Sequence, residues 1–243
     1  MMIKKKNLLI ALFFLASCSN ESSYEQQNLS ELIQPDLNYF SSQYDCSLLG
    51  ANNLNDLEQY IPKLSALLKN HSFKYQLEFY FADNQKNEIK SFIINVKNSE
   101  VIDREKLGLF INSENEIFQC LQKNNNLIAT TLISKLDIQN SIFYLEILDC
   151  EFSSDSNFGT FKVASDYFFN LLNEYSIAYK ADFLNSDSDS RNFYWHNLFN
   201  SPDDRDDFFA NWVGSDESIE IKELFSGQSE CFSSNSYIGY KVY

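Results

Sequence analysis

Tyr44-Asp45-Cys46-Ser47 resembles a later stretch of the chain, Leu148-Asp149-Cys150-Glu151, and the two cysteines lie 104 positions apart. The same spacing aligns Glu78 with Asp182, and the hydrophobic stretches around these two residues also correspond. A spacing that stays constant over such a length is better evidence of an internal repeat than any single match. We therefore predict that the chain contains two copies of one structural unit.

Each copy shows the same order of hydrophobic patterns. Strict alternation predicts strands, and apolar residues at helical spacing predict helices. In the first copy we expect a strand at 37–45, a helix at 54–68, a hairpin at 73–81 and 89–96, a second helix, and a last strand at 126–133. In the second copy the counterparts are 141–149, 161–172, 177–183, 191–199, a helix capped by Ser201 with Pro202 in its first turn, and 237–243.

The order β-α-β-β-α-β is the ferredoxin-like motif, so the predicted fold class is α+β with two tandem repeats. We place a signal peptide at 1–17, a polar tether at 18–36, and the repeats at 37–136 and 137–243. In such a sheet, of spatial order 4-1-3-2, the end of the first strand lies beside the start of the fourth.

The cysteines of each copy fall at this junction of the first and fourth strands. Four cysteines allow three pairings, and this topology selects Cys46–Cys120 and Cys150–Cys231. Each bridge closes a long loop, for which chain entropy suggests roughly 4 kcal/mol of stabilisation.

Two ferredoxin-like units in tandem resemble the dimeric α/β-barrel superfamily in fused form, where two sheets close around a shared cavity. The resemblance rests on the element order and the duplication, and it covers about 37–243. It implies that Lys74, Glu78, Lys180, Asp182, Glu146 and His196 surround a partly polar interior. Separate packing of the two units is the structural alternative.

The N-terminus carries Lys4, Lys5 and Lys6, then an apolar run, then Leu15-Ala16-Ser17-Cys18. This order resembles the bacterial lipoprotein signal, and the apolar run is too short to cross a bilayer. The resemblance implies cleavage before Cys18, a diacylglyceryl group on its sulfur, and attachment to the outer membrane because Ser19 is not aspartate. The compartment would then be oxidising, which agrees with an even number of remaining cysteines.

The composition limits the partners. The formal net charge is −15, and it becomes more negative once the signal lysines are removed. Such a surface repels phosphate backbones, so we expect no nucleic-acid partner and a membrane contact through the lipid alone. With two histidines and no C-x-x-C or H-E-x-x-H pattern, we expect neither a metal site nor a cofactor.

The candidate catalytic residues are His196, Glu146, Asp182 and Lys180 in the second copy. If the strands alternate as expected, these side chains and Tyr144 project from the face away from the helices. A histidine between carboxylates can act as a base or bind a metal. The plainer interpretation is a solvated polar sheet face. Trp195 and Trp212 are expected in the core.

Two functions follow from these patterns. The favoured one is a membrane-anchored, non-enzymatic envelope lipoprotein that binds a ligand or a partner. The alternative is an enzyme resembling the cofactor-independent oxygenases or lyases of the dimeric α/β-barrel superfamily. A structure separates them by showing whether a cavity holds His196 with a carboxylate.

Overall fold

The computed structural model describes residues 35–70, 75–83, 89–101, 103–112, 115–134, 140–186, 190–213 and 215–242. The first half contains β1 (Tyr39–Leu48), α2 (Leu54–Asn70), β2 (Tyr75–Ala82), β3 (Ser91–Asn98), α3 (Arg104–Asn112) and β4 (Phe118–Ser134). The second half contains β5 (Ile142–Phe152), α4 (Phe158–Glu174), β6 (Tyr179–Asn185), β7 (Asn192–Phe199), α5 (Pro202–Trp212), α6 (Asp216–Gln228) and β8 (Ser229–Lys241). The predicted order of elements is confirmed, and α6 is an addition.

The strands form one closed barrel in the order β1-β3-β2-β8-β5-β7-β6-β4. Each half keeps the predicted ferredoxin-like order, β4-β1-β3-β2 and β8-β5-β7-β6. The halves are joined where the last strand of each pairs with the second strand of the other, β8 with β2 and β4 with β6. The predicted fused barrel is therefore confirmed, and its halves are connected by hydrogen-bonded strands.

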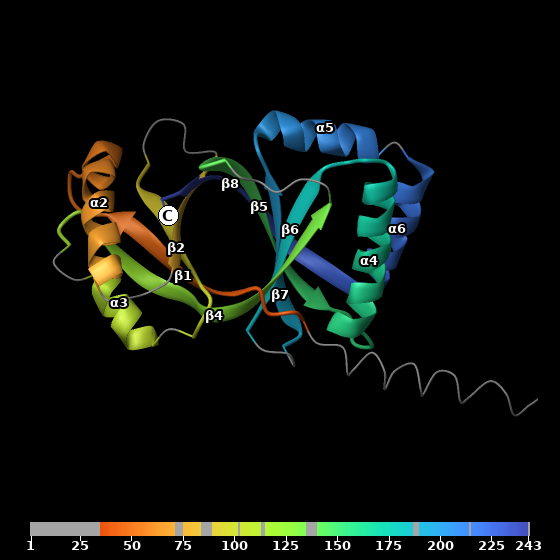
Figure 1. The fold of residues 1–243 in the computed structure, drawn as a ribbon, viewed down its shortest axis with the longest axis horizontal. Coiled ribbons are helices and arrows are strands. Elements are labelled where there is room, and N and C mark those ends of the chain that lie inside the picture. The colour runs from red at the N-terminus through yellow and green to blue at the C-terminus, as the bar shows by residue number, and fades with distance from the viewer. Residues whose placement is uncertain are drawn as a thin grey trace, which may run out of the picture.

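Helices cover the outside of this barrel on opposite sides (Figure 1). The first half carries α2 and α3, and the second carries α4, α5 and α6. One hydrophobic core lies under each helical layer, and the core of the second half is dominated by aromatic rings. A third apolar cluster, which includes Tyr80, Phe143 and Leu198, brings together strands of both halves and therefore fills part of the barrel interior.

The last strands of the two halves, β4 and β8, are longer than the sequence patterns indicated. β4 and β8 begin before the second cysteine of each half, because their polar N-terminal parts still pair with β1 and β5. At the start of α5, Ser201 accepts a hydrogen bond from the Asp204 backbone and Pro202 occupies the first turn, as predicted. The additional helix α6 accounts for the greater length of the second copy.

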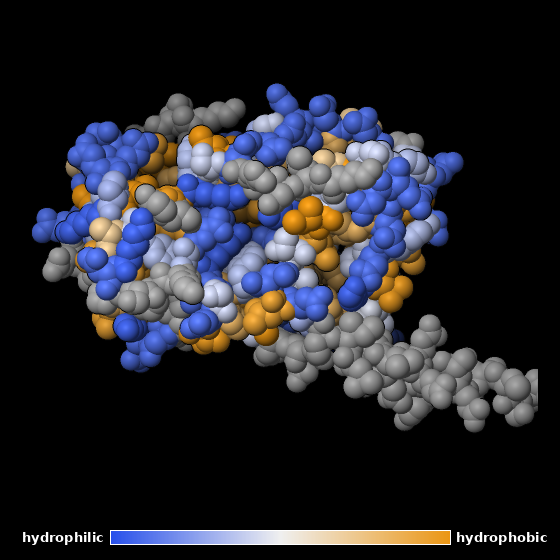
Figure 2. Space-filling model, viewed as in Figure 1, coloured by the Kyte–Doolittle hydropathy of each residue, from blue (hydrophilic) through white to orange (hydrophobic). Residues whose placement is uncertain are grey.

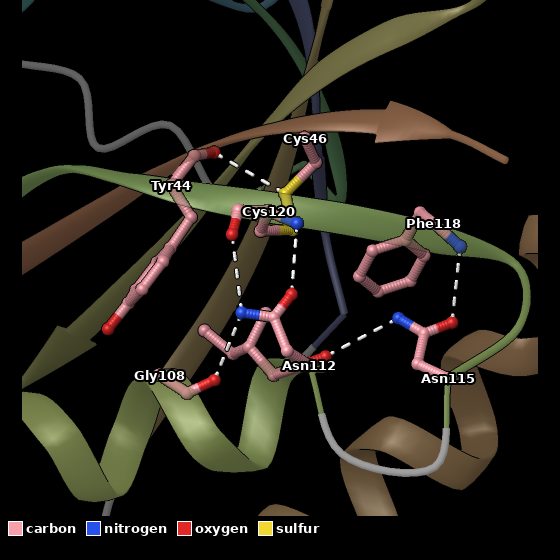
Figure 3. The surroundings of a disulfide bond; sticks show 8 residues. Tyr44, Cys46, Gly108, Asn112, Asn115, Phe118 and Cys120 are labelled. Atoms are coloured by element: carbon pink, nitrogen blue, oxygen red, sulfur yellow. Dashed lines mark hydrogen bonds between the residues drawn. A yellow bond between two sulfur atoms is a disulfide. The ribbon is translucent and has the colours of Figure 1, made fainter.

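Both predicted disulfides are present. Cys46 is bonded to Cys120 and Cys150 to Cys231, and in each case the two residues are directly opposite each other on neighbouring strands. Figure 3 shows how the first is supported: the Asn112 side chain accepts a hydrogen bond from the Cys120 backbone N–H at 2.9 Å and donates one to its carbonyl at 3.2 Å. The end of α3 is thereby fixed to the disulfide.

A close contact with an aromatic ring explains why a glycine occupies one position in β8. A Cβ on Gly239 would lie 2.3 Å from the Phe143 ring of neighbouring β5. Phe143 is fully buried in the interior cluster and meets Tyr80 edge to face, with ring centroids 6.2 Å apart. Gly239 therefore allows the barrel to be filled by a large ring from an adjacent strand.

The predicted side-chain direction of β5 is wrong. Ile147 belongs to the interior cluster, so its neighbour Glu146 points the other way, toward α5, and Tyr144 packs in the helix-side core. Around this position β5 is apolar on both faces, and the Glu146 carboxylate on the helix side is paired with Arg205.

Several expectations fall on residues outside the described ranges: Cys18 with the signal, most of the tether, and Lys74. Within the described ranges, no helix is long and apolar enough to cross a membrane.

Candidate functional site

A cavity of about 440 Å³ lies between the sheet of the second half and its three helices, and we call it the helix-side cavity. The strands contribute alternate residues that face the helices, and α4 contributes Phe161 and Phe168, which are spaced two helical turns apart. Its aromatic lining residues are Phe161, Phe168, Tyr179, Phe193, Trp195, Phe208, Phe209, Trp212 and Phe225. A pocket with aromatic walls and a few polar groups is the usual form of a small-molecule site.

Three polar side chains from β6 and β7 meet on the sheet side of this cavity. The Trp195 Nε1 donates hydrogen bonds to the Asn197 Oδ1 at 2.7 Å and to the Tyr179 hydroxyl at 3.1 Å. The Tyr179 hydroxyl itself donates to the Asn197 Oδ1. Burial raises the pKa of Tyr179 above its ordinary value, so its hydroxyl remains a donor at neutral pH.

An ion pair between the buried Glu146 and the half-buried Arg205 holds the Asn197 amide in place. The Asn197 Nδ2 donates to the Glu146 carboxylate at 3.2 Å, and the Arg205 guanidinium contacts the other carboxylate oxygen at 2.8 Å through both Nε and Nη2. Only one orientation of the amide satisfies the carboxylate on one side and two donors on the other. Arg205, from α5, therefore fixes the polar group through Glu146.

A second cluster occupies the barrel interior. The Lys97 Nζ lies 3.2 Å from the Glu78 Oε1 and 3.5 Å from the Asp182 Oδ2. β3 and β6 are not neighbours in the barrel, so the contact between Lys97 and Asp182 crosses its interior. Burial lowers the pKa of Lys97, but the two carboxylates outweigh it and hold that pKa above its ordinary value.

Hydroxyl groups complete the interior cluster. The Tyr39 hydroxyl donates to the Asp182 Oδ2 at 2.6 Å, and the Thr131 hydroxyl donates to the Oδ1 at 2.7 Å. The Tyr80 hydroxyl donates to the Glu78 Oε2 at 2.6 Å. Burial acts to raise the pKa of Asp182, but Lys97 and the hydroxyl groups of Tyr39 and Thr131 lower it below the ordinary value.

His196 lies opposite Asp182 on β7 and faces the same way. It is 2% exposed, and its Nε2 has no hydrogen-bond partner among the residues that the structure describes. Burial lowers its pKa to about 3, which exceeds the opposing effect of Asp182. His196 is therefore neutral at physiological pH, and it does not line the helix-side cavity.

The predicted candidates are therefore divided between two places. Lys180, Asp182 and His196 face the barrel interior with Glu78, whereas Glu146 lies on the helix side of β5, where it accepts a hydrogen bond from Asn197, a lining residue of the helix-side cavity. The described residues contain no group of His, Cys, Asp or Glu that could hold a metal ion. Trp195 and Trp212 are buried as expected, and both also line the helix-side cavity.

The sequence analysis missed Tyr179, Asn197, Arg205 and Lys97. A signal for Asn197 existed, because the alternation on β7 places it on the same face as Trp195. Lys97 alternates in the same way with Asn95 on β3. Arg205 had no comparable signal, since its direction depends on how α5 packs on the sheet.

No protein-family model matches the chain, and no curated protein matches it by sequence. Solved structures are similar in fold. A protein described as a monooxygenase from Lactobacillus acidophilus is 11% identical with a TM-score of 0.45, over 83% of this chain and 94% of that one. One from Fusobacterium nucleatum, described in the same way, is 8% identical with a TM-score of 0.48, over 84% and 93%. An anthrone oxidase-like protein is 9% identical with a TM-score of 0.46, over 87% and 94%.

The strand order itself shows the fold, a closed α/β barrel made of two ferredoxin-like halves in one chain. These neighbours also correct one expectation. The sequence analysis favoured a non-enzymatic envelope lipoprotein, whereas the similar structures are described as monooxygenases or oxidase-like proteins. The favoured interpretation is therefore set aside, and the enzyme alternative remains a proposal that depends on the cavity of the second half.

Proposed function

We propose that this protein is an enzyme of the oxygenase type that acts on a small aromatic molecule held in the helix-side cavity. The observation that carries the proposal is an aromatic cavity of about 440 Å³ with hydrogen-bond donors grouped at one side. Aromatic walls bind a flat ring by offset or edge-to-face contacts. The donors then fix the position of an oxygen atom on that ring.

The donors suit a phenol or enol substrate. When such a substrate loses its proton to solvent, negative charge develops on its oxygen. In the free protein the Trp195 Nε1 and the Tyr179 hydroxyl both donate to the Asn197 Oδ1. They stabilise the anion by exchanging this acceptor for the substrate oxygen. The resulting electron-rich anion can itself react with O₂. With a hydroxyanthrone, one oxygen atom is added at the CH₂ carbon to give the anthraquinone and the other leaves as water, so the substrate supplies all the electrons. Arg205 acts as a positioning residue in this scheme, because it orients Asn197 through Glu146.

Binding can be tested first by fluorescence. The chain has two tryptophans, and both line this cavity, so intrinsic fluorescence reports on it directly. We expect a hydroxyanthrone probe to quench that emission in a saturable way. Quenching that rises linearly with the probe would indicate collisions only and would contradict a binding site.

Turnover can be tested by O₂ consumption with a hydroxyanthrone and a hydroquinone, each corrected for autoxidation. Removing one donor of this kind typically costs about 100-fold or more in rate, so Tyr179→Phe should lose most of the activity. Tyr175→Phe is the matched control, because that hydroxyl is exposed and donates to Glu217. Equal rates in the two variants would contradict the proposed role of the cavity.

The location of the enzyme is a separate prediction. The Cys18 signal implies a lipid anchor and attachment to the outer membrane, with the lipid as the membrane contact. Cys18→Ala should abolish metabolic labelling with a radioactive fatty acid and leave an unprocessed precursor. Unchanged labelling would show that the anchor assignment is wrong, and it would leave the cavity proposal unaffected.

A further inference from the structure

The helix-side cavity reaches the surface at one edge, where its lining becomes polar. Three of its lining residues are exposed: Lys222 and Ser226 on α6, and Cys231 on β8. Lys222 is the one charged residue among the described residues that line the cavity. Figure 2 shows hydrophilic residues over most of α4 and α5, at the right of the view, so the aromatic lining lies beneath a polar surface. A ligand at the open edge therefore meets an ammonium group.

The spacing of residues along α6 places Lys222 on the cavity side of the helix. Ser218 and Phe225, four residues before it and three residues after it, also line the cavity. Such intervals put residues on one face of a helix. On this face Ile221 is buried in the core, and the centroid of the Phe225 ring lies 6.4 Å from that of Trp195. The packing of its neighbours thus fixes the side on which Lys222 emerges.

The ammonium group of Lys222 has no acidic partner within the described part of the chain. Its neighbours on the helix surface are the residues three and four positions away. All four are uncharged: Ser218, Ile219, Phe225 and Ser226. Two acidic side chains of α6, Glu217 and Glu220, accept hydrogen bonds from the hydroxyl groups of Tyr175 and Tyr167. No carboxylate is among the described lining residues, so the charge that a ligand meets in the cavity is positive.

The serine hydroxyl groups that line the cavity already have acceptors. Those of Ser218, Ser226 and Ser229 each donate to a backbone carbonyl group in or beside α6. A lysine ammonium group carries three N–H donors, and those of Lys222 remain available to a ligand at the open edge. The donors of Trp195 and Tyr179 lie on the sheet side of the same cavity. The cavity therefore offers hydrogen-bond donors at two separate places, with aromatic walls between them.

Building on the oxygenase function proposed above, we propose that the substrate is a hydroxylated aromatic acid whose carboxylate binds Lys222. Its hydroxyl group meets the donors of Trp195 and Tyr179, and its rings lie between the aromatic walls. Hydrogen bonds between an ammonium group and a carboxylate are stronger than those between neutral groups. Lys222 thereby selects an acid over a neutral molecule of the same shape, since only the acid gains an ion pair at the edge.

Calorimetric titration in the absence of O₂ tests this selection without turnover. The probes are 6-hydroxy-2-naphthoate, which carries the hydroxyl group and the carboxylate at opposite ends, and the uncharged 6-hydroxy-2-naphthamide. We expect the acid to bind about tenfold more tightly than the amide, as is typical of one hydrogen bond to a charged group. Lys222→Met should remove this preference, and Lys222→Arg should keep it. Lys162→Met, which removes an exposed lysine of α4 outside the cavity lining, should also keep it.

The ratio of the two affinities is taken within one variant, so a general loss of folding does not imitate the loss of selection. Equal affinities for acid and amide in the unmodified protein would overturn the proposal, as would an unchanged preference in Lys222→Met. Either result leaves the oxygenase function standing. If neither naphthalene binds, the carboxylate site and the oxygenase function both fail. If the acid is preferred but no aromatic substrate consumes O₂, the oxygenase function alone fails and the cavity remains a binding site for aromatic acids.

Discussion

Glu78 and Asp182 occupy the same position in the two repeats, and they share one counter-ion, the ammonium group of Lys97, at 3.2 and 3.5 Å. Both carboxylates are buried, with exposed fractions of 0% and 1%. Their neighbours also correspond, because Asn95 lies opposite Glu78 and His196 lies opposite Asp182. The lysine that joins them comes from the first half alone, where the second half has Leu198.

Replacing this shared cation should destabilise the fold. Lys97→Met leaves two buried carboxylates without their counter-ion, and removing one partner of a buried pair typically costs about 3–5 kcal/mol. Urea unfolding measures the loss. Lys162→Met breaks only an exposed pair with Asp166 and should cost about 0.5 kcal/mol or less. Similar losses in both variants would show that the buried ion pairs of Lys97 add no more to the free energy of unfolding than an exposed pair does.

His196 should make the stability depend on pH. Its folded pKa is about 3 and its ordinary value is 6.5, so between these values the unfolded chain binds a proton that the folded chain does not. The free energy of unfolding therefore falls as the pH falls from 6.5, by up to about 1.4 kcal/mol per pH unit. His196→Asn, which introduces the residue found at Asn95, should remove this slope.

The window for that measurement is set by Asp182. The pKa of Asp182 is lowered from 3.8 in the fold, so its contribution is fully present above 3.8 and is lost only at lower pH. The pKa of Glu217 is likewise lowered from 4.5, so its contribution also changes mainly at low pH. The difference in urea midpoints between the wild type and His196→Asn, measured between pH 5 and 7, therefore reports on His196. Parallel curves for the wild type and His196→Asn would contradict the assignment of a neutral buried histidine.

Two glycines provide a matched pair for testing the interior packing. Gly239→Ala forces a methyl group into the Phe143 ring, and overpacking of this kind costs about 1–3 kcal/mol. Gly227→Ala meets nothing within 4 Å and lies in α6, where alanine is the better helix former. We expect thermal unfolding to show a loss in the first variant only. A loss in Gly227→Ala as large as in Gly239→Ala would argue against the close approach.

Removing either disulfide should lower the stability by about 2–5 kcal/mol. The two bridges differ in a second respect, since Cys150 and Cys231 line the helix-side cavity and Cys46 and Cys120 do not. Replacing the second pair with serine should therefore also weaken binding of the hydroxyanthrone, measured by fluorescence. Peptide mapping without reduction checks the pairing, and a bridge between the two halves would contradict it.

The sequence contained enough to predict the order of elements, the disulfides and the correspondence of Glu78 with Asp182, because these depend on spacing along the chain. It did not predict the direction of Glu146, since β5 is apolar on both faces and the choice depends on Arg205 in a distant helix. The helix-side cavity was missed for a related reason. Aromatic residues at core spacing indicate a core, and only the packing of three helices shows that space remains between them.

Because β8 pairs with β2 and β4 pairs with β6, the barrel is in effect a dimer that cannot dissociate. Dilution cannot separate the halves and expose the barrel interior, as it can in a dimer of separate subunits. A substitution in one half is also not repeated in the other half. In a pair of identical subunits, a lysine at the Lys97 position would appear twice at the centre, with two positive charges for two carboxylates. Covalent fusion allows one half to carry the lysine where the other carries a leucine, so the two halves can differ at corresponding positions.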